Sequence, residues 1–194
     1  MTRLLLCLVL LLPTLPASAQ LRLTLAPSSR MWIEGSSTVS RFTCTATTVQ
    51  GKGTVPNQIV RPVHDDTSGS VWVEVRAFDC GNGRMNADFY RALKADDAPL
   101  IVFTLDDVTG TALQGDTARV EVRGQLALAG TTRQVAFEGQ GRRTATGHLH
   151  FTGMLPLRMT DFGIKPPTAL MGLIRAHDEL IVHFDLTAQP VVDQ

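Results

Sequence analysis

The sequence has few aromatic residues and no surplus of charge. Phe, Trp and Tyr make up 6% of its 194 residues, and 18 Lys and Arg balance 18 Asp and Glu. No run of adjacent basic residues is longer than the pair Arg142–Arg143. A phosphate backbone would therefore meet no concentrated positive charge, and the composition argues against nucleic acid as a partner.

Motifs of the common enzyme classes are missing as well. The chain has no G-x-S-x-G elbow, no H-E-x-x-H pair and no Gly-rich phosphate loop. Asp161–Gly163 matches a three-letter kinase motif, but the other kinase motifs are absent, so we interpret the match as coincidence. The pairs Asp96–Asp97 and Asp106–Asp107 are typical of solvated turns. The sequence predicts no catalytic residue and no cofactor.

Only one long apolar run is present, and it lies at the N-terminus. Arg3 precedes the apolar run Leu4–Leu12, and the small residues Ala17–Ala19 follow it, a pattern typical of a cleaved secretory signal. The run is short for a membrane span, although a retained N-terminal anchor is an alternative. We expect residues 1–19 to be a signal peptide. Residues 20–194 would then form one exported domain, periplasmic or secreted, with no membrane span.

Cysteine is scarce, with three residues in the whole chain, and Cys7 lies inside the apolar run. Removal of the signal leaves Cys44 and Cys80 in a compartment that permits oxidation. Neither belongs to a C-x-x-C motif, which weighs against a redox pair or a two-thiolate metal site. We expect a disulfide that stabilises the fold by roughly 4 kcal/mol in the chain-entropy model.

Most of the chain alternates apolar and polar residues, as β-strands with one buried face do. The pattern is longest in "SVWVEVRAF" and "ARVEVRGQLAL", and shorter versions bring the expected number of strands to about eight. "MNADFYRALKADDAP" has helical spacing instead and predicts a helix from Ala87 to Ala95 with Asn86 as its N-cap. The fold class is all-β, and periodicity alone leaves both a sandwich and a barrel open.

One hairpin stands out between Leu126 and Gly139, in the stretch "LALAGTTRQVAFEG". Two apolar runs flank Gly130–Arg133, which we interpret as a tight turn. We expect Gly130 to adopt a positive φ angle and Arg133 to point outward or toward a turn carboxylate.

Three ordered motifs resemble the YceI-like family: the helix before "PLIVFTL", the hairpin "GQLALAGTT" and the late segment "DFGI". The similarity spans Trp32 to Thr187. It implies a single eight-stranded antiparallel lipocalin-like β-barrel with one short helix, which binds a long apolar molecule such as a polyisoprenoid or an isoprenoid quinone. The family's opening "D-x-x-H-S" segment is replaced here by Trp32–Ser37, which has neither Asp nor His. Any role of those polar residues is therefore not transferred.

Alternation places ten apolar side chains inside such a barrel, where they would bind the ligand. Small residues on the same face, including Ala77 and Gly124, would leave room for it. An eight-stranded barrel can also be filled by its own side chains, so an exported structural or interaction module with a solid core is the alternative. The expected ligand-binding residues are Val73, Val75, Phe103, Val122, Leu126, Leu128, Val135, Phe137, Phe151 and Phe184.

Three histidines raise the question of a metal site. His148 and His150 should project from one strand face, and His183 on the last strand is a possible third ligand. No Cys or carboxylate is spaced to complete the set. We therefore interpret the three as outward-facing polar residues and predict no metal site.

Overall fold

The computed structural model describes residues 20–56, 67–114 and 117–191. The expected signal peptide, residues 1–19, lies outside the described residues. Within the described ranges, no helix is long and apolar enough to cross a bilayer.

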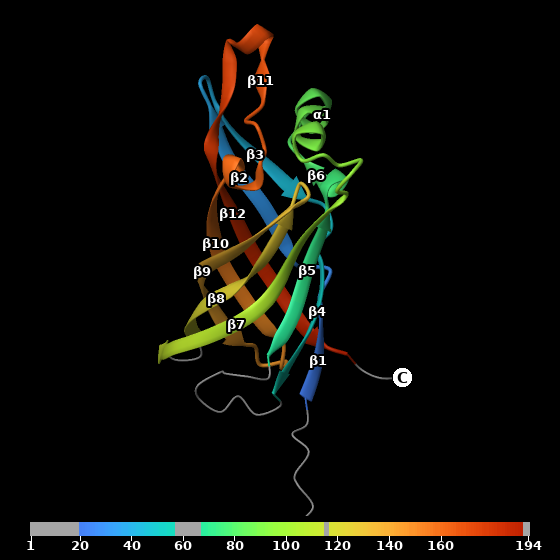
Figure 1. Cartoon of the computed structure of the whole chain (residues 1–194). Helices are drawn as coiled ribbons and strands as arrows, with labels where there is room; N and C mark the ends of the chain where they lie inside the picture. The colour runs from blue at the N-terminus through green and yellow to red at the C-terminus, as the bar shows by residue number, and fades with distance from the viewer. Residues whose placement is uncertain (1–19, 57–66, 115–116, 192–194) are drawn as a thin grey trace, which may run out of the picture.

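Strands dominate the structure, and eight of them close into an antiparallel barrel (Figure 1). The hydrogen-bonded order around the ring is β1-β4-β5-β7-β8-β9-β10-β12, and pairing of β12 with β1 closes it. The predicted all-β fold and eight-stranded barrel are thus confirmed. The strands are β1 (Gln20–Leu25), β2 (Arg30–Ser37), β3 (Arg41–Ala46), β4 (Gln50–Pro56), β5 (Ser68–Glu74), β6 (Phe78–Asp79), β7 (Leu100–Gln114), β8 (Thr117–Leu128), β9 (Thr131–Arg143), β10 (Leu149–Arg158), β11 (Thr168–Ala169) and β12 (Ile174–Pro190).

Strands β1 and β2 lie end to end beside β12, and β3 and β4 lie next to them in the same way. The long strand β12 pairs with β2 along its first part and with β1 at its end. In the same way β2 pairs with β3, while β1 pairs with β4. A short turn separates β1 from β2, where the Ser29 N–H donates to the carbonyl of Ala26.

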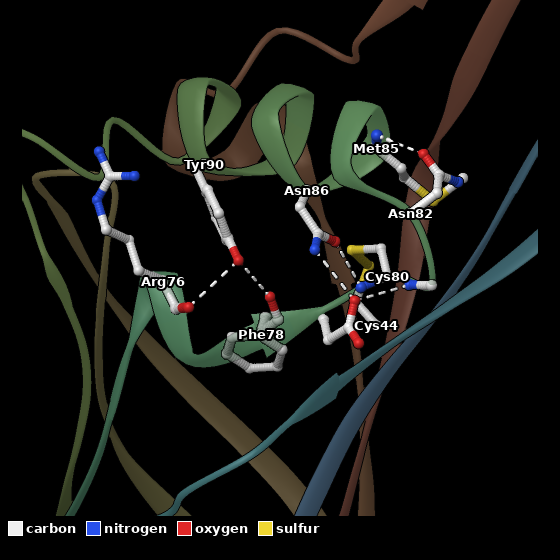
Figure 2. Close-up of a disulfide and its surroundings, with 10 residues drawn as sticks. Cys44, Arg76, Phe78, Cys80, Asn82, Met85, Asn86 and Tyr90 are labelled. Atoms are coloured by element: carbon white, nitrogen blue, oxygen red, sulfur yellow. Dashed lines mark hydrogen bonds between the residues drawn. A yellow bond between two sulfur atoms is a disulfide. The ribbon is translucent and has the colours of Figure 1, made fainter.

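The single α-helix, α1 (Gly83–Ala92), begins and ends earlier than predicted. Asn82, not Asn86, is its N-cap, and the Asn82 side chain accepts a hydrogen bond from the Met85 N–H at 2.8 Å. Asn86 lies in the first turn, where its side chain accepts from the Cys80 N–H at 2.7 Å (Figure 2). The helix stops before Ala95 because Lys94 adopts a left-handed conformation with φ 54°.

The β8–β9 hairpin turn is shorter than predicted. Only Ala129 and Gly130 form the loop, with φ angles of 51° and 81°, which is the pattern of a two-residue type I′ turn. The positive φ of Gly130 is confirmed. Placing the turn at Gly130–Arg133 was wrong, because Thr131 already pairs with Leu128 in the sheet. The right-handed twist of the two strands favours such a primed turn.

The predicted disulfide is confirmed, and it fastens one end of the barrel. Cys44 of β3 is bonded to Cys80, which follows β6 directly below α1 (Figure 2). The hydroxyl of Tyr90 on α1 donates to the carbonyl of Phe78 at 2.7 Å, so the helix is held to the same short strand. Phe78 itself is almost fully buried. We call this closed end of the barrel the α1 end and the opposite one the far end.

Candidate functional site

The barrel encloses a cavity of about 550 Å³. Ligand pockets for small molecules measure roughly 300–1,000 Å³. Lining side chains come from both ends of the barrel: Leu93 and Ile164 lie at the α1 end, while Val55 and Leu149 lie at the far end. The cavity is therefore elongated along the barrel axis.

Eight of the ten residues expected to bind a ligand lie on the cavity wall. Val75 does not, because β5 ends at Glu74 and Val75 lies in a 3-10 turn, η1 (Val75–Ala77), where it is fully buried. Val135 does not either, and instead lines a second hollow outside the cavity. The eight residues on the wall are Val73, Phe103, Val122, Leu126, Leu128, Phe137, Phe151 and Phe184.

Phenylalanine rings form a continuous cluster across the cavity wall. The centroid of Phe137 lies 5.7 Å from that of Phe103, 6.3 Å from that of Phe151 and 5.4 Å from that of Phe184. The rings come from β7, β9, β10 and β12, so the cluster joins four barrel strands. Four of the 11 aromatic rings of the chain thus gather around its interior.

Many residues that line the cavity were not predicted from the sequence. Those of β12 could have been, because β12 has the same period-2 alternation as the strands from which the other lining residues were predicted. Residues from β1, β2 and α1 were missed because these elements are short, and which of their side chains reach the barrel interior depends on packing against distant strands. The missed residues include Leu23, Leu25, Met31, Ile33, Phe89, Leu93, Leu180, Val182 and Leu186.

Gly124 does not supply free volume, contrary to expectation. A Cβ on Gly124 would overlap the ring of Phe103 and the carbonyl oxygen of Thr104. The Phe103 ring therefore packs directly against Gly124, and the space beside this glycine is not empty. Ala77 belongs to η1 and does not line the cavity. Gly141 is different, because it lines the cavity and a Cβ there would meet nothing within 4 Å.

Every charged residue that lines the cavity is basic. Lys52, Arg142 and Arg143 lie at the far end and Arg158 at the α1 end, whereas no Asp or Glu of the described residues lines the cavity. The central part of the wall is apolar. The cavity thus offers an apolar channel with basic residues at its far end, while Arg158 at the α1 end is paired with Asp178 at 3.1 Å.

His150 marks the rim of the far end. Its Nε2 lies 2.9 Å from Asp185 Oδ1, and its Nδ1 accepts a hydrogen bond from Arg142 Nε at 3.3 Å. Asp185 also forms an ion pair with Arg30 at 2.6 Å. The hydrogen bond from His150 and that from Arg30 hold the pKa of Asp185 below its ordinary value. The carboxylate therefore stays ionised and fixes the His150 ring.

The structure does not bring the three histidines together. His183 stacks on Trp32 with ring centroids 4.9 Å apart, and its Nε2 lies 3.4 Å from Glu34. His148 lies in the turn before β10, where its N–H donates to the Thr144 hydroxyl. Among the described residues, no group of three or more His, Cys, Asp or Glu side chains is placed to hold a metal ion.

The barrel wall is incomplete near the α1 end. Strands β9 and β10 pair only from Leu149–Arg143 to Gly153–Gly139, although both continue beyond that point. A second hollow of about 870 Å³ lies along this unpaired seam, and we call it the seam hollow. Leu155, Leu157 and Phe162 line both the seam hollow and the cavity.

A short 3-10 turn, η2 (Met159–Phe162), closes the seam from the inside. Its apolar side chains Met159 and Phe162 are buried. Arg133 is exposed, in agreement with the first of its two predicted orientations, and its Nε donates to the main-chain oxygen of Asp161 at 2.9 Å rather than to a turn carboxylate. Asp178 accepts from both the N–H and the hydroxyl of Thr160, which lowers the Asp178 pKa.

Known proteins share the family and the fold of this chain. A family model described as the YceI-like domain matches residues 26–188. The crystal structure of Burkholderia cenocepacia BcnA is similar, with a TM-score of 0.67, 16% identity, and coverage of 83% of this chain and 96% of that one. A polyisoprenoid binding domain from Saccharophagus degradans gives a TM-score of 0.66 at 13% identity, covering 88% and 99%. The Campylobacter jejuni YCEI protein gives 0.51 at 13% identity, covering 66% and 75%. A comparison with curated protein sequences finds no significant match.

Proposed function

The chain belongs to the YceI-like family, and from this we propose that it is an exported binding protein that holds a long apolar ligand in its barrel. A polyisoprenoid, an isoprenoid quinone or a similar lipid fits the proposal. The observation that carries it is the elongated apolar cavity of about 550 Å³. The similar fold of a domain described as polyisoprenoid binding supports the same class of ligand.

Hydrophobic burial supplies the binding energy in this proposal. Each methylene removed from water contributes about 0.8 kcal/mol before the cost of ordering the chain is subtracted. The Phe137 cluster and the β12 residues Val182 and Leu186 would surround the chain. The alternative, a barrel packed solid, is disfavoured by a cavity of this size.

The basic far end suits the polar end of the ligand. Lys52, Arg142 and Arg143 lie there, beside the His150–Asp185 pair. A headgroup that accepts hydrogen bonds, such as a quinone carbonyl or a phosphate, would find donors at this rim. The chain of the ligand would then run toward α1.

Export is the second part of the proposal. The N-terminal pattern is typical of a secretory signal, and the Cys44–Cys80 disulfide suits an oxidising compartment. Such a protein would carry or store its ligand outside the cytoplasm.

Native mass spectrometry of the mature protein, purified from its source organism, tests the proposal. Added mass that fragments into an isoprenoid lipid is the expected result. Gly141→Phe places a ring in the cavity where no atom lies in the way of its Cβ, so this variant should lose the added mass and remain folded. Thr43→Phe is the matched control, because Thr43 is exposed on the outer face. A wild-type protein without added mass, or one whose added mass survives Gly141→Phe, contradicts the proposal.

A further inference from the structure

Two loops at the α1 end are joined into one projecting unit. The Thr38 N–H donates to the Arg175 carbonyl at 3.0 Å, and the Arg175 N–H donates to the Thr38 hydroxyl at 3.3 Å. These bonds connect the β2–β3 turn to the start of β12, directly after the β11–β12 loop. We call residues 37–41 and 168–175 the apex. Figure 1 shows the β11–β12 loop extending beyond the barrel.

The apex holds the three most exposed large apolar side chains of the described residues. Met171 is 105% exposed, Leu173 77% and Val39 66%. Thr38 bonds to the main chain of residues 173 and 175, so the turn that carries Val39 is held to the segment that carries Leu173. Exposed apolar side chains that gather at one projecting point are typical of a binding surface.

The backbone of Met171 has an unfavourable conformation in addition to this exposure of its side chain. Met171 adopts a left-handed conformation with φ 54° and ψ 33°, a region that costs energy for residues other than glycine and asparagine. Ala129 also has a positive φ, but its side chain is buried. Lys94 shares this φ and is exposed, but its side chain is charged, so Met171 alone of the three combines the left-handed conformation with an exposed apolar side chain.

The charge of the apex has one sign. Arg41 and Arg175 are its only charged residues, and neither range contains Asp or Glu. Both arginines are exposed, and neither forms an ion pair with a described residue. Arg41 also lines the seam hollow, so the apex adjoins the place where the barrel wall is incomplete.

We propose that the apex docks on the surface of an anionic lipid bilayer. Val39, Met171 and Leu173 enter the interface between headgroups and acyl chains, and the two arginines meet anionic headgroups. The inference rests on the proposed function, because a carrier of a membrane lipid has to meet a bilayer to load. Docking through the apex brings the seam hollow to the bilayer surface.

Flotation of the mature protein with phosphatidylcholine vesicles, with and without phosphatidylglycerol, tests the docking. We expect binding to the anionic vesicles, and a loss of about tenfold or more for the triple variant Val39→Ser, Met171→Ser, Leu173→Ser. The matched control replaces three exposed apolar residues elsewhere, by Leu100→Ser, Met154→Ser and Val191→Ser, and should bind as the wild type does. Arg41→Gln with Arg175→Gln should weaken binding to anionic vesicles only.

A single variant separates docking from folding. Met171→Asn suits the left-handed conformation, so it should raise the melting temperature while it weakens vesicle binding. Equal binding by the apex and control triple variants, or no binding by the wild type, overturns the proposal. Self-association in sedimentation velocity that the apex substitutions abolish would assign the surface to a second copy and also overturn it.

Measuring retained lipid on the same samples keeps the two proposals apart. A protein that carries lipid but ignores vesicles refutes the docking alone. A protein that binds vesicles but never carries lipid refutes the proposed function alone.

Discussion

The ring of Phe103 covers Gly124 on the neighbouring strand so closely that a Cβ at residue 124 would overlap it. Gly124→Ala should therefore displace the ring or the strand and lower the free energy of unfolding by about 1–3 kcal/mol. Gly141→Ala is the control, since its Cβ meets nothing within 4 Å, and should be neutral. Urea denaturation measures both. Equal stability of the two variants would show that Phe103 moves aside without cost.

The Cys44–Cys80 bond is expected to be a major part of the stability. It closes a loop with a sequence separation of 36, which in the chain-entropy model stabilises the fold by roughly 4 kcal/mol. The paired substitution Cys44→Ser, Cys80→Ser should lower the free energy of unfolding accordingly, as should reduction of the wild type. Thiol titration of the denatured mature protein should find no free cysteine. Two free thiols would rule out the bond in the purified protein.

Gly130 should tolerate a larger side chain poorly, although space is open around it. No atom lies within 4 Å of a Cβ built at Gly130, so a substitution meets only backbone strain at φ 81°. Gly130→Val should cost about 1–3 kcal/mol, because β-branched residues are disfavoured at positive φ. Gly130→Asn should cost less, since asparagine tolerates this region. Melting temperatures of the two variants should differ in that order; an unchanged value for Gly130→Val contradicts the type I′ turn.

Local alternation predicted the parts of the fold that depend on single strands. Val122, Leu126 and Leu128 lie inside the barrel because β8 is regular over its whole length, and period-2 patterning determines a face wherever a strand is straight and paired on both sides. The same reasoning failed at Val75, where the strand ends one residue earlier and a 3-10 turn begins. Patterns of apolar residues do not mark such an end.

Features that depend on contacts between segments far apart in the chain could not be predicted from the sequence. The role of Gly124 requires knowing that Phe103 lies across it, and the seam hollow requires knowing that pairing of β9 with β10 stops at Gly139 and Gly153. The prediction of the N-cap was wrong for a different reason. Asn82 and Asn86 have the same capping chemistry, and the hydrogen bond that Asn86 Oδ1 accepts from the Cys80 N–H decides between them.

Acid should weaken the fold through three carboxylates with lowered pKa values: Asp79, which accepts hydrogen bonds from Asn86 and Gly81, Asp178 and Asp185. Asp185 is held by His150 and then by Arg30, and Asp178 by Thr160 and then by Arg158. A carboxylate whose folded pKa lies below the unfolded value of about 3.9 stabilises the fold above that value and loses this contribution as the pH falls through its folded pKa. The free energy of unfolding should thus fall below about pH 4. Asp178→Asn and Asp185→Asn should flatten this fall, and an unchanged pH profile in both would contradict the assignment.

Ligand affinity should follow chain length, since burial of the chain supplies the energy. Each added isoprene unit that fits should tighten binding by about 0.8 kcal/mol per buried CH₂, less the cost of ordering it, until the cavity of about 550 Å³ is full. Further units should then add nothing. Fluorescence displacement with a series of isoprenoid alcohols measures this dependence.

The matching prediction concerns salt. For neutral isoprenoids, salt should have little effect, because the central wall carries no charge. For the corresponding phosphates, added salt should weaken binding through Lys52, Arg142 and Arg143 at the far end, and Arg143→Gln should reduce that dependence. Affinity that ignores chain length while it varies with the headgroup would place the ligand at the rim and leave the cavity without a role in binding.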